Sequence, residues 1–128
     1  MVATEYVTRP RALISRILSG ERRYLSAGDI HGLLEREQAK VALSTVYRTL
    51  EHLLAKGQVS ARVDPAGETT YVSCAGDHHH HAICRVCGKV EDVDCSALEA
   101  IGGALKAHHG FVLEDHAVEF FGRCNACA

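Results

Sequence analysis

The sequence predicts an α+β protein in two parts, three helices with a β-hairpin followed by a smaller lobe of mixed helix and strand. Apolar residues recur at helical spacing three times in the first half and alternate thereafter. Thiols and imidazoles gather between Cys74 and Cys87, near the middle of the chain. The charge changes sign in the same region: residues 1–63 hold ten Lys or Arg and six Asp or Glu, whereas residues 64–128 hold four and ten. Only the first half therefore suits a polyanionic partner.

Three amphipathic helices are predicted in the first half, over residues 9–18, 26–38 and 44–56. Ser26 and Ser44 are suitable N-cap residues for the second and third helices. The residues expected to be buried are the apolar ones on one stripe of each helix: Leu13, Ile14, Ile17, Leu18, Ala27, Ile30, Leu33, Leu34, Val46, Leu50, Leu53 and Leu54.

Two strands, over residues 58–63 and 68–73, are expected to form a hairpin through the Asp-Pro-Ala-Gly segment at 64–67. Three helices followed by a hairpin is the order of a winged helix, whose third helix enters the major groove of DNA. The exposed face of that helix carries Thr45, Tyr47 and Arg48, the candidate DNA-binding residues; the alternative is an ordinary solvated face. We expect a winged-helix DNA-binding domain over residues 1–74.

The second half is predicted to form a small α/β domain over residues 75–128. Its expected elements are strands at 89–94, 111–113 and 116–121 and a helix at 97–108 with Leu98, Ile101 and Leu105 on one stripe. Exposed strand edges make such a lobe a plausible dimerisation unit. No segment approaches the ~18 apolar residues of a membrane span, so we expect a cytoplasmic protein without membrane contact.

Four of the six cysteines form two Cys-x-x-Cys pairs separated by 36 residues: Cys84, Cys87, Cys124 and Cys127. In a reducing compartment this pattern favours zinc over disulfides. We expect one structural zinc site with four thiolate ligands. The alternatives are two redox dithiols or inert cysteines.

Four consecutive histidines precede the first pair. In an extended segment neighbouring side chains point to opposite faces, so His78 and His80 would face one way and His79 and His81 the other. Cys74 is the nearest soft ligand for the second pair, and Glu99 and His116 suit the first; ordinary solvated or core roles are the alternatives for Glu99 and His116. Cys95 is predicted to be a buried small residue and not a ligand.

Several of these segments together resemble the ferric uptake regulator (Fur) family over nearly the whole chain. The matching segments are Thr45-Val-Tyr-Arg-Thr-Leu, Tyr71, the histidine run, Ile83-Cys-x-x-Cys-Gly, His109-Gly-Phe, His116 and Phe121-Gly-x-Cys-x-x-Cys. The resemblance implies a homodimeric, metal-sensing transcriptional repressor that binds AT-rich inverted-repeat operator DNA and represses metal uptake genes. It implies no enzymatic activity.

Within the family the chain is most similar to the zinc uptake regulators (Zur). Iron and peroxide sensors place a histidine where this chain has Tyr24, and zinc sensors have a cysteine at the position of Cys74. The resemblance implies a regulatory zinc site of Cys74, His79 and His81. It also implies a second regulatory site, whose expected ligands are His78, His80, Glu99 and His116.

The fourth ligand of the regulatory site stays open, because Ser60 replaces the aspartate of similar zinc sensors. Asp64, Glu68, Asp77 or water are the substitutes, and Asp92 occupies a ligand position of the peroxide sensors. The alternative functions are therefore an iron- or peroxide-sensing regulator and, from other classes, a zinc-storage protein or a zinc hydrolase.

Overall fold

The computed structural model describes residues 8–74, 79–114 and 118–128. It has the predicted α+β composition and divides into two compact units, Met1–Gly76 (unit 1) and Asp77–Ala128 (unit 2). Within the described ranges, none of the helices has the length and hydropathy needed to span a membrane.

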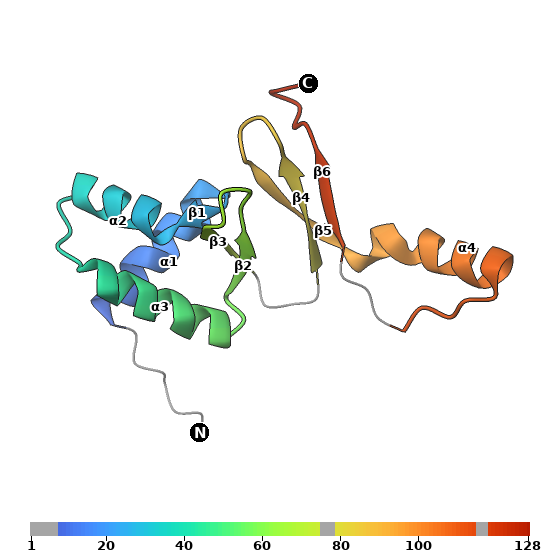
Figure 1. The fold of residues 1–128 in the computed structure, drawn as a ribbon, viewed down its shortest axis with the longest axis horizontal. Coiled ribbons are helices and arrows are strands. Elements are labelled where there is room, and N and C mark those ends of the chain that lie inside the picture. The colour runs from blue at the N-terminus through green and yellow to red at the C-terminus, as the bar shows by residue number, and fades with distance from the viewer. Residues whose placement is uncertain (1–7, 75–78, 115–117) are drawn as a thin grey trace. The chain divides into compact units, whose positions relative to one another are not determined.

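Unit 1 contains the three predicted helices, α1 (Arg9–Glu21), α2 (Ala27–Arg36) and α3 (Leu43–Ala55) (Figure 1). Ser26 caps α2 as predicted, because its Oγ accepts a hydrogen bond from the N–H of Asp29 at 3.0 Å. The Asp29 carboxylate accepts the Ser26 N–H in return, also at 3.0 Å. Such a reciprocal capping box fixes where the helix starts.

Two predictions about α3 are wrong. Ser44 lies inside the first turn instead of capping it, because the helix begins at the Ala42 carbonyl, which accepts hydrogen bonds from Thr45 N–H and Val46 N–H at 3.0 and 3.1 Å. Leu54 is 45% exposed and not buried, since it lies at the edge of the apolar stripe. The other face of α3 is consequently broad and solvent-exposed.

The hairpin is confirmed as β2 (Val59–Val63) and β3 (Thr69–Ser73), which pair in antiparallel register from Val59 opposite Ser73 to Val63 opposite Thr69. A two-residue strand that the sequence did not predict, β1 (Leu25–Ser26), adds to the other edge of β3. In the hairpin turn, Asp64 Oδ1 accepts the N–H groups of Ala66 and Glu68, each at 2.9 Å.

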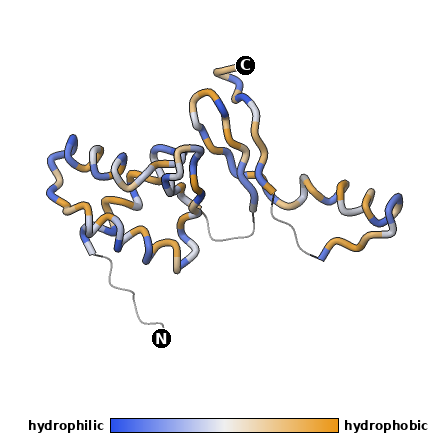
Figure 2. Tube along the Cα trace, viewed as in Figure 1, coloured by the Kyte–Doolittle hydropathy of each residue, from blue (hydrophilic) through white to orange (hydrophobic). Residues whose placement is uncertain are grey.

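Hydrophobic and hydrophilic residues alternate along the helices of unit 1 (Figure 2), and the hydrophobic ones meet in a single core. This core joins all three helices to the sheet: Ile14, Ile17, Leu18, Leu25, Ala27, Ile30, Leu34, Ala39, Val46, Leu50, Leu53, Val59 and Tyr71. Leu13 and Leu33, predicted to be buried, are only partly so. Packing of amphipathic faces thus explains why the helices form here.

Unit 2 is built on a three-stranded sheet of order β5-β4-β6, from β4 (His79–Cys84), β5 (Val90–Asp94) and β6 (Glu119–Gly122) (Figure 1). β4 pairs antiparallel with β5 and parallel with β6. The predicted strand at 89–94 is thereby confirmed. The predicted strand at 116–121 is described only in part, because residues 115–117 lie outside the described residues. Its described part pairs with β4 from Glu119 onward.

The predicted helix of unit 2 is divided into a 3₁₀ turn, η1 (Cys95–Leu98), and α4 (Glu99–His109). Leu98 is buried, but no residue of α4 is, and Ile101 is 51% exposed, contrary to the predicted stripe. The strand expected at residues 111–113 is also wrong. Phe111 N–H donates instead to the Leu105 carbonyl at 3.1 Å, closing the C-terminal end of α4 after Gly110 in the left-handed region.

Candidate metal centre and nucleic-acid interface

The two Cys-x-x-Cys pairs meet at one end of the unit 2 sheet. Cys84 ends β4 and Cys87 lies in the turn to β5, while Cys124 and Cys127 follow β6. The parallel register, with Cys84 opposite Gly122, brings the two pairs together. Each pair forms a tight turn, closed by Gly88 N–H on the Cys84 carbonyl at 3.0 Å and by Cys127 N–H on the Cys124 carbonyl at 2.9 Å.

The four thiols fit a tetrahedral metal site. Their sulfur atoms lie within 4.8 Å of one another, and the Cys87 and Cys124 sulfurs are 3.8 Å apart. Zinc–sulfur bonds of about 2.3 Å at tetrahedral angles place two sulfurs about 3.8 Å apart, whereas a disulfide requires about 2.0 Å. All four cysteines are free. The donor set and its spacing therefore suit a zinc ion bound by four thiolates.

Backbone dipoles prepare this cluster for a cation. The N–H of Cys87 and, next in effect, that of Cys124 point at the Cys84 sulfur and lower its pKa from 9.0 to about 6. The hydrogen bond between the Cys127 and Cys124 side chains raises the pKa of Cys127 to about 12. The lowered pKa favours the thiolate form of Cys84, and a thiolate is the form that binds metal.

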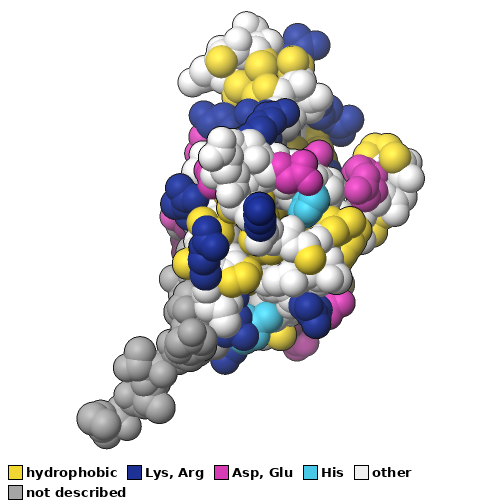
Figure 3. All heavy atoms as spheres, turned by 90° about the vertical axis from the view of Figure 1, so that its left-hand side faces the viewer, with side chains coloured by type: hydrophobic (Ala, Val, Ile, Leu, Met, Phe, Trp, Pro, Cys, Tyr) yellow, Lys and Arg dark blue, Asp and Glu magenta, His cyan; other side chains and the backbone are white. Residues whose placement is uncertain are grey.

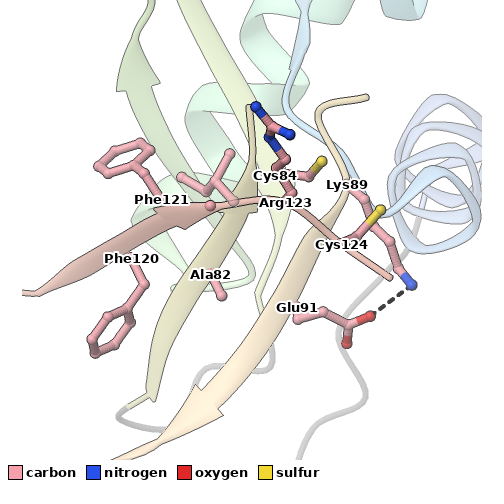
Figure 4. Close-up of a pocket in the computed structure, with 10 residues that line it drawn as sticks. Ala82, Cys84, Lys89, Glu91, Phe120, Phe121, Arg123 and Cys124 are labelled. Carbon is pink, nitrogen blue, oxygen red and sulfur yellow. Dashed lines mark ion pairs between the residues drawn. The ribbon is translucent and has the colours of Figure 1, made fainter. Parts of the chain in front are cut away.

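Cys84 and Cys124 also line a hollow of about 250 Å³ whose lining residues come from β4, β6 and the start of β5 (Figure 4). Phe120 and Phe121 point to opposite sides of β6, as neighbouring residues of a strand do. Lys89 and Glu91 also line this hollow, where the Lys89 Nζ forms an ion pair with the Glu91 carboxylate at 2.9 Å. The remaining residues that line it are Ala82, Ile83, Gly122 and Arg123.

The histidine run enters the sheet as predicted, extended from His79 onward and paired with β5. His80 and His81 are both buried. Because neighbours alternate, these two imidazoles face opposite sides of the sheet. His81 Nε2 lies 3.5 Å from the Asp92 carboxylate directly opposite it, and His80 Nε2 lies 3.6 Å from the sulfur of Cys95.

The structure does not gather the other predicted ligands around one point. Among the described residues, the four cysteines are the one group of three or more potential ligands whose donor atoms lie within 4.8 Å of one another. Cys74 is half-buried at the end of β3, where its N–H donates to Gln58, and Glu99 is exposed at the start of α4. His78, His116 and the side chain of His79 lie outside the description.

Cys95 departs from its prediction as a buried apolar residue. It is half-buried at the start of η1, and its sulfur contacts an imidazole. No spacing signal in the sequence indicates this contact, because it depends on the register of β4 with β5.

The three candidate DNA-binding residues lie on α3, away from the core. Tyr47 is 48% exposed, and Thr45 Oγ1 accepts a hydrogen bond from Arg48 at 3.4 Å. Thr45 and Arg48 also border a hollow whose other lining residues include Arg11 and His52, so α1 contributes a cation that sequence reasoning did not single out. Lys and Arg side chains lie dispersed over the face seen in Figure 3.

Comparison with known proteins places these features in a family context. The family model described as "Ferric uptake regulator family" matches residues 5–121. A zinc uptake regulation protein of Mycobacterium tuberculosis is 38% identical over 120 residues, 94% of this chain and 92% of its own. A ferric uptake regulation protein of Cupriavidus metallidurans is 33% identical over 91% of this chain and 82% of its own.

Solved structures agree with this comparison. The chain is similar to FurB from M. tuberculosis, a zinc uptake regulator, with a TM-score of 0.56, 37% identity and coverage of 94% and 93% of the two chains. It is also similar to a zinc uptake regulator complexed with zinc and DNA, with a TM-score of 0.65, 31% identity and coverage of 94% and 82%.

Proposed function

The chain belongs to the ferric uptake regulator family, and from this premise we propose that it is a zinc-responsive transcriptional repressor. As a homodimer loaded with zinc it binds AT-rich inverted-repeat operator DNA and represses metal uptake genes. It acts where that DNA is, in the cytoplasm, and it has no catalytic role. The observation that carries the proposal is the thiolate cluster, four sulfurs within 4.8 Å of one another in a chain with 38% identity to a zinc uptake regulator.

Three metal sites are proposed. Cys84, Cys87, Cys124 and Cys127 hold the structural zinc, which ties the end of β6 to the β4–β5 turn. Cys74, His79 and His81 hold the regulatory zinc, and His78, His80, Glu99 and His116 belong to the second regulatory site. Asp92 supports the regulatory site by holding the His81 imidazole, at 3.5 Å, in one orientation.

Zinc is favoured over iron by the thiol of Cys74, because thiolates are soft ligands that suit zinc better than ferrous iron. Tyr24 also favours zinc over iron, because it stands at the position where iron and peroxide sensors have a histidine. Its ring lies 5.6 Å from the Arg62 guanidinium carbon, a cation–π contact within unit 1. A peroxide-sensing regulator is the second candidate, since it would use Asp92 as a ligand.

DNA binding is proposed to use α3 in the major groove. Thr45 and Tyr47 contact base edges, while Arg48 and Arg11, which border one hollow, contact phosphates. Phosphate contacts set the register on the duplex and base contacts set the sequence preference.

The homodimer is proposed to form through unit 2. Within its described residues, α4 buries no side chain although Ile101 is apolar, and β5 and β6 are the two edge strands of the sheet. Unburied apolar surface of this kind is typical of an association surface. A dimer also presents two α3 helices to an inverted repeat.

Metal sensing follows from the position of the regulatory ligands along the chain. Cys74 directly follows β3, and His79 and His81 lie in β4, so joint ligation restrains the chain between them. Zinc and DNA then bind with positive coupling, which must be reciprocal.

Operator affinity with and without zinc tests this proposal. The probe is a fluorescent duplex selected by the zinc-loaded protein from a random-sequence library, and binding is followed by anisotropy. We expect at least a tenfold gain in affinity with zinc, and equal affinity in both states would refute sensing. Metal content of the wild type and of Cys74→Ser, measured in parallel, separates zinc from iron.

A further inference from the structure

The second regulatory site has a neighbour that the family resemblance does not assign. Cys95 lies at the junction between β5 and η1, and its sulfur is 3.6 Å from Nε2 of His80. The register explains this contact. His80 is paired with Val93, and Cys95 follows Val93 by two residues, so its side chain returns to the same face of the sheet.

The distance between the two donor atoms is that of a thiol–imidazole hydrogen bond in the metal-free chain, and it also suits a metal site. A zinc ion about 2.3 Å from a sulfur and about 2.0 Å from an imidazole nitrogen, at a tetrahedral angle, holds the two donor atoms about 3.5 Å apart. His80 is only 5% exposed, which fixes its ring within the sheet. Cys95 is half-buried and therefore open on one side to an entering ion.

A carboxylate lies nearby along the chain. Glu99 comes four residues after Cys95, and η1 and α4 form one continuous helical segment. The Glu99 side chain is exposed at the start of α4, and the family resemblance assigns it to the site that contains His80. His80, Cys95 and Glu99 are not gathered in the metal-free chain, so joint ligation requires the Glu99 side chain to move.

We propose that Cys95 is a metal ligand and supplies a thiolate to the site that contains His80. Its proton passes to solvent when the metal binds. The inference rests on the proposed function for the existence of this site, and it changes the donor set from imidazole and carboxylate to one that includes sulfur. Sulfur donors favour zinc and cobalt over manganese and ferrous iron, so Cys95 makes the second site selective.

Cobalt(II) spectroscopy tests the proposal, because a cobalt–thiolate bond gives an intense near-ultraviolet charge-transfer band that imidazole and carboxylate do not. The four-cysteine cluster is first filled with zinc, and its retention is checked by mass spectrometry. The variant Cys74→Ser removes the other thiol that lies outside the four-cysteine cluster. Cobalt added to Cys74→Ser should give the band, and the double variant Cys74→Ser with Cys95→Ser should lose it and bind this cobalt at least tenfold more weakly.

The band's absence in Cys74→Ser, or its persistence in the double variant, overturns the proposal. Should Cys74→Ser not fold, the single variant Cys95→Ser serves, with a lower charge-transfer intensity per cobalt than the wild type expected and an unchanged intensity overturning the assignment. Ser96→Ala, which leaves every proposed donor in place, is the matched control and should keep the band. Zinc-dependent operator binding by the wild type is measured separately, so absence of the band in Cys74→Ser together with intact sensing by the wild type refutes the role of Cys95 alone.

Discussion

Replacing one ligand of the four-cysteine cluster should unfold unit 2 and leave unit 1 intact. The perturbation is Cys124→Ser, which breaks the set of four sulfurs lying within 4.8 Å of one another. Unit 2 has few other anchors: among its described residues the buried hydrophobic side chains are Ile83, Cys84, Val90 and Leu98. Unit 1, in contrast, has the large core formed by α1, α2, α3 and the hairpin.

The magnitude follows from comparing two free energies. A structural zinc ion contributes about 10–16 kcal/mol of apparent binding free energy in small zinc domains. A whole domain is stable by only about 5–15 kcal/mol. The binding free energy lost with the zinc site should therefore exceed the free energy of unfolding of unit 2. The core of unit 1 is not affected by the substitution.

Amide hydrogen exchange with mass spectrometry is the suitable assay, because it reports each unit separately. In Cys124→Ser, peptides covering β4, β5 and β6 should exchange at the unfolded rate, and peptides covering α1 to α3 should keep wild-type protection. Asn125→Ser, which changes a residue between Cys124 and Cys127 and removes no thiol, is the matched control. Wild-type protection of β6 in Cys124→Ser would refute the reasoning.

Three further predictions concern DNA, metal and assembly. Arg48→Ala should weaken operator binding about tenfold and lower the salt dependence by about one phosphate contact, while Arg16→Ala should change neither; an unchanged salt slope in fluorescence anisotropy would contradict the contact. Asp92→Asn should weaken regulatory zinc binding about 10- to 100-fold by releasing His81, measured by competition with a chelating dye; wild-type affinity would rule this out. Ile101→Glu should convert the dimer to monomer in sedimentation experiments, and an intact dimer would exclude α4 from the interface.

The sequence predicted most of unit 1 because its signals are local. Helical spacing of apolar residues, the Ser26 cap and the Asp64–Gly67 turn each depend on neighbours within a few positions. The errors arose where local preference was overruled. Ser44 is a good cap by residue type, yet the helix starts two residues earlier, at the Ala42 carbonyl.

The sequence predicted those parts of the candidate site that depend only on the spacing of residues along the chain. Two Cys-x-x-Cys pairs and the alternation of consecutive histidines follow from sequence, and the sulfurs do converge. The contact of Cys95 with His80 could not be predicted, because it depends on the register of β4 with β5. The strand expected at Phe111 failed because an apolar run does not reveal that its first N–H closes a helix end.

The parallel pairing of β4 with β6 has a consequence for synthesis on the ribosome. His81 is opposite Glu119 in that pairing, so β6 joins the sheet of unit 2 only after nearly forty further residues have emerged. The strand pairings of unit 1, in contrast, can be completed once Ser73 has emerged. The helical unit can therefore mature on the nascent chain while the thiols of the first pair are still exposed. Metal supply during translation then governs how much of the newly made polypeptide escapes proteolysis.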